Sequence, residues 1–180
     1  YRGKYNKELT EEERMELLLM GIRGGATLCD IPGDTFAPCQ EQMTFEPSAV
    51  EKQKQLIRQI HGLGGEVLIS SHTGRFYTED EVSALANAQI ERGADVVKIV
   101  TVANSEEEQM TGLSAIARLK KELDRPFLFL VGGSHHRLIR QIGPALGVCM
   151  YLCVQRYRPV TTKVQPLIRS VKAIRDNMLL

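Results

Sequence analysis

Three kinds of feature that would assign a function directly are absent from the sequence. Neither a G-x-G-x-x-G turn nor a G-x-x-x-x-G-K-[ST] loop occurs, which removes the usual phosphate-binding signatures of nucleotide-binding sheets. The longest apolar runs, at 127–131 and 148–154, are far too short to span a bilayer. The net charge of +1 gives no long-range field that would attract nucleic acid or an anionic membrane. We therefore expect neither nucleic acid nor a membrane as a partner.

Cysteines are few, and their spacing is not typical of a zinc or redox site. Cys149 and Cys153 lie four residues apart on an expected strand, so we expect them to share one face. We interpret all the cysteines as core thiols, which suits a reducing cytoplasm. No signal peptide is visible at the start of the sequence. The remaining cysteines are Cys29 and Cys39.

The composition is that of an ordinary globular protein. Hydrophobic residues make up 43% of the sequence and charged residues 25%. A chain of 180 residues can bury a sizeable core, and we expect one domain over residues 1–180. Because the sequence begins with Tyr1 and not with methionine, we expect it to be a piece of a longer protein.

Helix and strand patterns alternate along the whole chain. Two capping boxes, Thr10 with Glu13 and Thr78 with Glu81, indicate helix starts. Pro166 is expected near the first turn of the last helix. The expected strands cover 26–32, 66–72, 94–102, 126–133 and 148–154, and a sixth would end at the N-terminus. The expected helices cover 9–25, 49–65, 78–93, 105–123, 134–143 and 162–177.

This alternation predicts an α/β fold with a parallel sheet that is covered on both faces. Two architectures satisfy it, an open doubly wound sheet and a (β/α)8 TIM barrel. A doubly wound nucleotide-binding domain should have a glycine-rich turn after its first strand, and its absence favours the barrel. The glycine pair in VGGS at 131–134 is more simply a turn. A closed barrel needs eight strands, and the sequence supplies five clear ones.

Two residues on successive expected strands could carry chemistry. His72 ends a strand, where its imidazole could move a proton near neutral pH. The alternative is a structural histidine that is hydrogen-bonded to a nearby loop. Lys98 lies between branched aliphatic residues in the run 96–100, so we expect exclusion of water to keep its amine neutral. A neutral amine can form a Schiff base with a ketone, while a snorkelling or edge-strand lysine is the alternative. Together the two are suited to removing a proton next to a carbonyl.

Three segments carry a resemblance to a known family. Residues 66–81, 93–108 and 143–154 read EVLISSHTGRFYTEDE, GADVVKIVTVANSEEE and GPALGVCMYLCV. They resemble type I 3-dehydroquinate dehydratase, in which one strand ends in Ser-x-His and the next carries the Schiff-base lysine. Here these motifs are Ser70-Ser71-His72 and Lys98-Ile99-Val100. The resemblance covers essentially the whole chain.

The resemblance implies a (β/α)8 barrel that dehydrates 3-dehydroquinate to 3-dehydroshikimate in the shikimate pathway, without metal or organic cofactor. Lys98 would attack the C3 ketone of the substrate. His72 would take the C2 proton, assist formation and hydrolysis of the Schiff base, and help the C1 hydroxyl leave. The adjacent pair His135-His136 is then better interpreted as loop or helix-start residues than as metal ligands.

The substrate carboxylate needs a cation, which the resemblance places at Arg140, seven residues before Gly147. The residue before Arg140 is Ile139, where the family has serine, and Arg137 is the competing choice. Either arginine could equally be a surface charge of a helix.

Further substrate-binding positions depart more from the family pattern. Arg2 matches an arginine that ends the family's third strand, but the acidic position after it falls on Asn6. Thr161 and Gln165 match a serine and a glutamine, four residues apart, that close over the substrate. The family's proline–glycine run before this glutamine is absent from the sequence.

If Arg2 ends the third strand, the first two family strands and their Glu-x-Arg motif lie outside this sequence. The chain would then be a fragment, or a shortened relative that pairs with itself or another chain to cover two open sheet edges. We expect a homo-oligomer. Beside the dehydratase, two hypotheses stay open. One is a non-catalytic relative that binds a small carboxylate or a partner protein; the other is a class I aldolase for a phosphorylated ketose.

Overall fold

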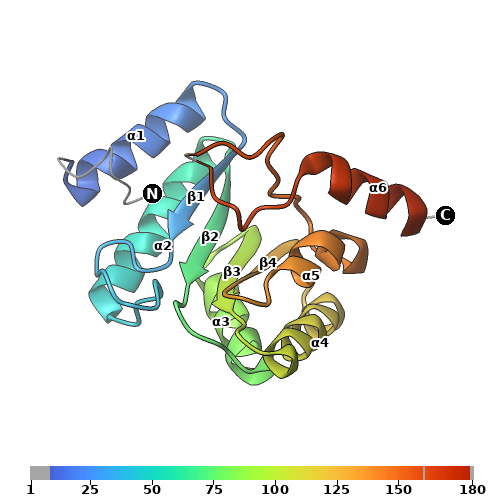
Figure 1. Cartoon of the computed structure of the whole chain (residues 1–180). Helices are drawn as coiled ribbons and strands as arrows, with labels where there is room; N and C mark the ends of the chain where they lie inside the picture. The colour runs from blue at the N-terminus through green and yellow to red at the C-terminus, as the bar shows by residue number, and fades with distance from the viewer. Residues whose placement is uncertain (1–8, 160, 179–180) are drawn as a thin grey trace. The chain divides into compact units, whose positions relative to one another are not determined.

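The computed structural model describes residues 9–159 and 161–178 (Figure 1). Four strands form one sheet in the order β1-β2-β3-β4, which is also their order in the chain. This order is expected when each strand is followed by a helix that brings the chain back to the end of the sheet where the strand began, so that the next strand runs parallel beside it. The strands are β1 (Leu28–Pro32), β2 (Glu66–His72), β3 (Val96–Val102) and β4 (Phe127–Gly132). The expected strands at 26–32, 66–72, 94–102 and 126–133 are therefore confirmed.

The chain divides into two compact units. The first comprises the chain up to His72 together with Leu85–Lys98, and the second comprises Thr73–Ala84 together with the chain from Ile99 onward. Elements of the first unit are α1 (Glu11–Arg23), β1, α2 (Pro47–Gly62), β2, most of α3 (Glu79–Arg92) and the start of β3. Elements of the second are the rest of β3, α4 (Glu106–Glu122), β4, α5 (Arg137–Ile142), the short 3-10 helix η1 (Gly143–Leu146) and α6 (Ile168–Met178).

Helix starts follow the expected capping boxes. The hydroxyl of Thr10 accepts a hydrogen bond from the Glu13 backbone N–H at 3.1 Å, and the Glu13 carboxylate accepts one from the Thr10 N–H at 2.7 Å. Thr78 and Glu81 make the same reciprocal pair before α3. These bonds satisfy backbone donors that the first turn of a helix leaves without partners.

The core of the first unit lies on one face of β1 and β2. The strands are parallel, with Cys29 opposite Val67 and Ile31 opposite Ile69. Since successive side chains of a strand point to opposite faces, these four side chains face the same way and pack against the helices. The buried cluster comprises Met15, Leu19, Ile22, Cys29, Ile31, Leu56, Ile57, Ile60, Val67, Ile69 and Ala94. The opposite face of these strands therefore carries Asp30 from β1 and Leu68, Ser70 and His72 from β2.

The expectation of a strand at 148–154 is wrong. Cys149 N–H still donates to the carbonyl of Phe127 at 2.9 Å, so the segment begins alongside β4. It then turns away, because Val154 pairs with the chain before α6: its N–H donates to the carbonyl of Pro166 at 2.9 Å and its carbonyl accepts from Ile168 at 3.0 Å. Only an isolated bridge, Val154 with Leu167, is strand-like in this segment.

Two further expectations are wrong. The last helix begins at Ile168 and not near residue 162, because the residue before a proline is restricted to extended conformations, which keeps Gln165 out of the helix. The cysteines are not all core thiols. Cys29 is buried, and burial raises its pKa to about 11, whereas Cys39 and Cys149 are exposed.

Candidate active site

An ion pair joins the first and third strands of the sheet. The Lys98 ammonium nitrogen lies 2.6 Å from a carboxylate oxygen of Asp30. Because β2 lies between β1 and β3, the pair reaches across β2 on the face that carries Leu68, Ser70 and His72. The side chain of Lys98 is 13% exposed and that of Asp30 is 42% exposed, so the amine is the more enclosed partner.

The surroundings of Lys98 differ from the expectation of an amine enclosed by aliphatic residues. Val97 and Ile99 are almost fully buried, but the pleat of the strand turns them to the face opposite Lys98. They anchor β3 in the core and do not surround the amine. Asp30, which sequence reasoning missed, is the actual polar neighbour of the amine. Its signal in the sequence is a single carboxylate inside a short apolar strand.

The backbone of Lys98 is held by a side chain from α3. Gln89, which is fully buried, accepts a hydrogen bond from the Lys98 N–H at 3.0 Å and donates one to the Lys98 carbonyl at 3.1 Å. The same amide nitrogen donates to the Ser71 hydroxyl at 3.1 Å. Gln89 therefore links the strand of the lysine to the strand of His72 at the level of the candidate site.

His72 has a defined tautomer. Its Nδ1 lies 2.7 Å from the side-chain oxygen of Gln42, and an amide oxygen can only accept a hydrogen bond. The proton of the neutral ring is therefore on Nδ1, and Nε2 is the basic nitrogen. Gln42 has a φ of +49°, a backbone conformation that side chains rarely adopt, so its loop must be held firmly. Nothing in the sequence marks Gln42, because it lies in an irregular loop.

The loop from β1 to α2, residues 33–46, is fixed by buried polar side chains. Arg92 donates to the carbonyl of Gly33 at 2.7 Å, to the side-chain oxygen of Gln53 at 2.8 Å, and to the carbonyl of Thr44. Gln53 in turn donates to the carbonyls of Gly33 and Thr35 at 3.1 and 2.7 Å. Burial lowers the pKa of Arg92, and these acceptors compensate for the lost water.

Arg140 lies in the second unit and lines a cavity of about 190 Å³. Its Nε donates to the carbonyl of Val131 at 2.6 Å, which fixes the guanidinium beside the end of β4. Burial lowers its pKa to about 10, so it keeps its charge at neutral pH. Arg137, the competing choice, lines the same cavity, as does Lys163.

The other expected substrate-binding residues are not brought to this cavity. Thr161 closes a turn: its hydroxyl accepts from the Arg158 N–H at 2.8 Å and bonds the Arg158 carbonyl at 2.9 Å. Gln165 accepts a hydrogen bond from Tyr157 through its backbone carbonyl at 3.1 Å, and its side chain does not line the cavity. Arg2 and Asn6 lie outside the described residues. The assignment of Arg2, Thr161 and Gln165 to substrate binding stays a prediction.

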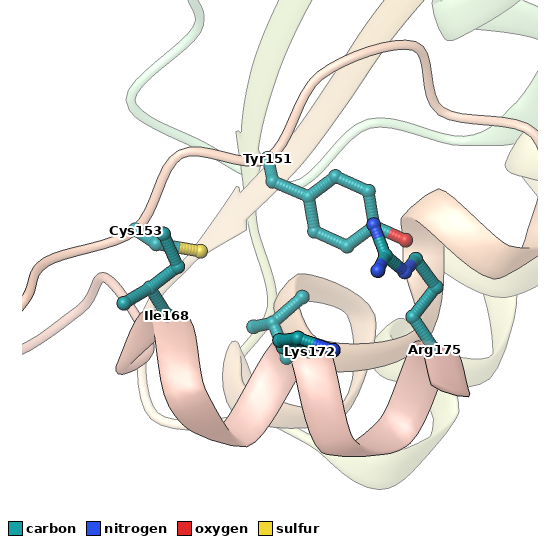
Figure 2. A pocket seen from close by; sticks show the side chains of 6 residues that line it. Tyr151, Cys153, Ile168, Lys172 and Arg175 are labelled. Atoms are coloured by element: carbon teal, nitrogen blue, oxygen red, sulfur yellow. The ribbon is translucent and has the colours of Figure 1, made fainter. Parts of the chain in front are cut away.

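A second cavity of the second unit, about 170 Å³ in volume, has a different character (Figure 2). Tyr151 and Cys153 face Ile168, Lys172 and Arg175 of α6 across it. Both cations are already paired with the carboxylate of Asp176. Its lining combines the apolar side chains of Ile168 and Val171 with two cations that share one carboxylate, and we assign it no chemical role.

Neither a metal-binding cluster nor a helix suited to crossing a membrane occurs in the part of the chain that the structure describes. Within residues 9–159 and 161–178, no group of three or more His, Cys, Asp or Glu side chains could hold a metal ion. In the same part of the chain, no helix has both the length and the apolar character that a membrane crossing requires.

A four-stranded sheet whose strands alternate with helices, with polar side chains on the face away from those helices, has the arrangement of part of a β/α barrel. Within the β/α-barrel class the chain belongs to the type I 3-dehydroquinase family, whose sequence profile matches residues 2–156. The curated 3-dehydroquinate dehydratase of Alkaliphilus oremlandii is 32% identical over 96 residues, which are 52% of this chain and 38% of that protein.

Solved structures support the fold. The 3-dehydroquinate dehydratase of Geobacillus kaustophilus matches 95% of this chain with a TM-score of 0.76 at 19% identity. The type I enzyme of Clostridium difficile, solved with covalently modified comenic acid, matches 94% with a TM-score of 0.75 at 17% identity. The expected barrel type of fold is thus confirmed. The chain spans 61% and 62% of the lengths of these two proteins.

Proposed function

We propose that the protein is a lyase that dehydrates 3-dehydroquinate to 3-dehydroshikimate through a Schiff base on Lys98. The observation that carries this proposal is the placement of the Lys98 amine, paired with Asp30 at 2.6 Å, on the sheet face shared by His72. An amine beside a histidine base is the arrangement needed to remove a proton next to a carbonyl. Family membership supports the same reaction.

The proposed chemistry begins when Lys98 gives up its proton and its nitrogen adds to the ketone carbon. Loss of water from the adduct gives an iminium ion, whose positive charge acidifies the neighbouring C–H bond. His72 takes this proton through Nε2, and the electron pair of the C–H bond forms an enamine. The enamine then expels the hydroxyl group two carbons from the former carbonyl, which leaves as water with the proton from His72. A second water hydrolyses the iminium and releases Lys98.

Asp30 and Gln42 are proposed to position the two reacting groups. The ion pair with Asp30 holds the Lys98 amine in one position, so the nitrogen is directed over β2 and not into solvent. Gln42 keeps the proton of His72 on Nδ1, which makes Nε2 the basic nitrogen of the neutral ring. Neither residue forms or breaks a bond to the substrate in this proposal.

Recognition of the substrate carboxylate is assigned to Arg140, with Arg2, Thr161 and Gln165 as further predicted contacts. Support for Arg140 comes from its charge, its place beside the end of β4 and its cavity. A guanidinium fixed through Nε still presents its two terminal nitrogens, which suit a carboxylate.

We also propose that the protein works as a homo-oligomer in the cytoplasm and needs no cofactor. Of the four strands among the described residues, β1 and β4 are the outer ones, so each has an edge that a second copy could cover. The four free cysteines suit a reducing compartment.

A turnover assay tests the proposed function. Dehydration of 3-dehydroquinate is followed by the ultraviolet absorbance of its conjugated product, with the chain and with Lys98→Ala. Lys121→Ala, an exposed lysine on α4, is the matched control. Activity in the chain and in Lys121→Ala, with loss in Lys98→Ala, supports the proposal. Equal activity in all three proteins contradicts it.

A further inference from the structure

The cavity beside Arg140 carries more positive charge than one carboxylate requires. Arg137, Arg140 and Lys163 all line it, and none of its lining residues is Asp or Glu. Within residues 9–159 and 161–178, none of these three cations forms an ion pair with a carboxylate. Their charges converge on one space without a counter-ion from the part of the chain that the structure describes.

The cavity drawn in Figure 2 also has cations in its lining, but these cations are paired with a carboxylate. Its two cations, Lys172 and Arg175, lie within one helical turn of Asp176 and are paired with it. Arg118 on α4 is likewise paired, with Asp80 and Glu122 at 2.5 and 2.8 Å. The cations of the Arg140 cavity differ from these neighbours because no carboxylate accompanies them.

Arg140 distinguishes this cavity from a merely basic surface, because its side chain is held in a fixed position. Its side chain is partly buried and is anchored through Nε to the Val131 carbonyl, so it is held in place without a ligand. Arg137 is one turn earlier on the same short helix, α5, and Lys163 comes from the segment before α6. Cations from two segments of the chain thus line the same cavity.

The size of the cavity limits what it can hold. At about 190 Å³ it is smaller than the roughly 300–1,000 Å³ of sites that enclose a whole small molecule. It suits a single compact charged group. Tyr157 and Gln141 add polar groups to the lining, and the Tyr157 hydroxyl donates its proton to the Gln165 carbonyl, which leaves the phenolic oxygen as an acceptor.

We propose that this cavity binds a dianionic phosphate group, free or as part of a phosphorylated small molecule, through Arg137, Arg140 and Lys163. This inference rests on the proposed function, which assigns the substrate carboxylate to Arg140, and extends it: a phosphate group can occupy the same place beside Arg140. A single carboxylate is served by Arg140 alone. A phosphate group carries about twice the charge and three acceptor oxygens, which match the additional two cations.

Isothermal titration of the whole chain at constant ionic strength tests the proposal, with inorganic phosphate, glycerol 3-phosphate and acetate as probes. We expect inorganic phosphate to bind at least about fivefold more tightly than acetate, and Arg137→Ala and Lys163→Ala each to lose about two- to fivefold, as for exposed ion pairs. Arg169→Ala, an exposed arginine on α6 outside the cavity, should bind as the unchanged chain does. Circular dichroism of each variant establishes that it is folded.

The probes also separate the sources of the anion. Tighter binding of glycerol 3-phosphate than of inorganic phosphate supports a phosphate ester as the natural ligand, and the reverse supports free phosphate. Equal affinities for phosphate and acetate, or an equal loss in Arg169→Ala, would overturn the proposal. These titrations do not depend on Lys98, so the phosphate site and the dehydratase activity can fail independently of one another.

Discussion

Asp30 and Lys98 form an ion pair that spans the width of a strand, from β1 over β2 to β3, with 2.6 Å between the two charged atoms. A pair of this kind fixes the direction of a long and otherwise mobile side chain. Both residues belong to the first unit, as do His72 and Gln42, so the proposed reacting groups and their partners are held by one compact body.

Removal of the Asp30 charge should slow the chemistry without removing the lysine. Asp30→Asn keeps the size of the side chain but not its charge, so the amine loses the partner that directs it. We expect formation of the Schiff base to slow by about 10- to 100-fold, the range typical of a misplaced reacting group. Rapid quenching with borohydride measures this rate. Asp124→Asn, on an exposed turn, is the control, and an equal rate in both variants would show that the ion pair has no role.

His72 should be needed for proton transfer and not for covalent capture. In His72→Ala we expect turnover to fall by about 10²–10⁴-fold, the usual contribution of a positioned general base, while borohydride still fixes ligand on the protein. Steady-state kinetics and intact-protein mass spectrometry are measured on one preparation, with His135→Ala as the control. Turnover in His72→Ala close to that of the unchanged chain would make His72 a structural residue.

Gln42 should affect the rate of the reaction more than binding. Gln42→Ala removes the acceptor that holds the proton of His72 on Nδ1, and we expect kcat to fall about tenfold with little change in KM. Gln42→Glu keeps an oxygen at the same reach and should recover most of the loss. A parallel change in KM and kcat, without recovery by glutamate, would indicate that Gln42 only supports the loop.

Arg92 should contribute to stability through the loop that carries Gln42. Arg92→Ala leaves the buried carbonyls of Gly33 and Thr44 without this donor, and we expect the free energy of unfolding to fall by about 2–4 kcal/mol. Urea denaturation followed by circular dichroism measures the change. Arg58→Ala removes an exposed ion pair with Glu51 and should change it by no more than about 1 kcal/mol. Equal losses in the two variants would contradict the role of Arg92.

The repeating elements, and the strands on which Lys98 and His72 lie, could be predicted from the sequence because their signals are local. Thr10 and Glu13 carry a capping box within a single turn, and the strand of His72 ends where its apolar run ends. The segment 148–154 is as apolar as a strand, yet its partner is the chain around Pro166, which no local pattern could reveal.

The contacts that complete the candidate site could not be predicted because they join distant parts of the chain. Asp30 precedes Lys98 by two strands, and Gln42 meets His72 only because Arg92 and Gln53 hold the intervening loop. Sequence patterns describe which face of an element a residue occupies, whereas the neighbour across that face depends on sheet order and loop path. The position of Lys163 beside Arg140 is of the same kind.

The central claim is that the Lys98 amine forms the Schiff base, and borohydride trapping tests it most directly. The chain is incubated with 3-dehydroquinate and reduced, and the modified peptide is located by mass spectrometry. We predict that the reduced ligand is on the peptide that contains Lys98, and that Lys98→Arg forms no adduct although its charge is kept. An adduct on a different lysine, or one that persists in Lys98→Arg, would contradict the account.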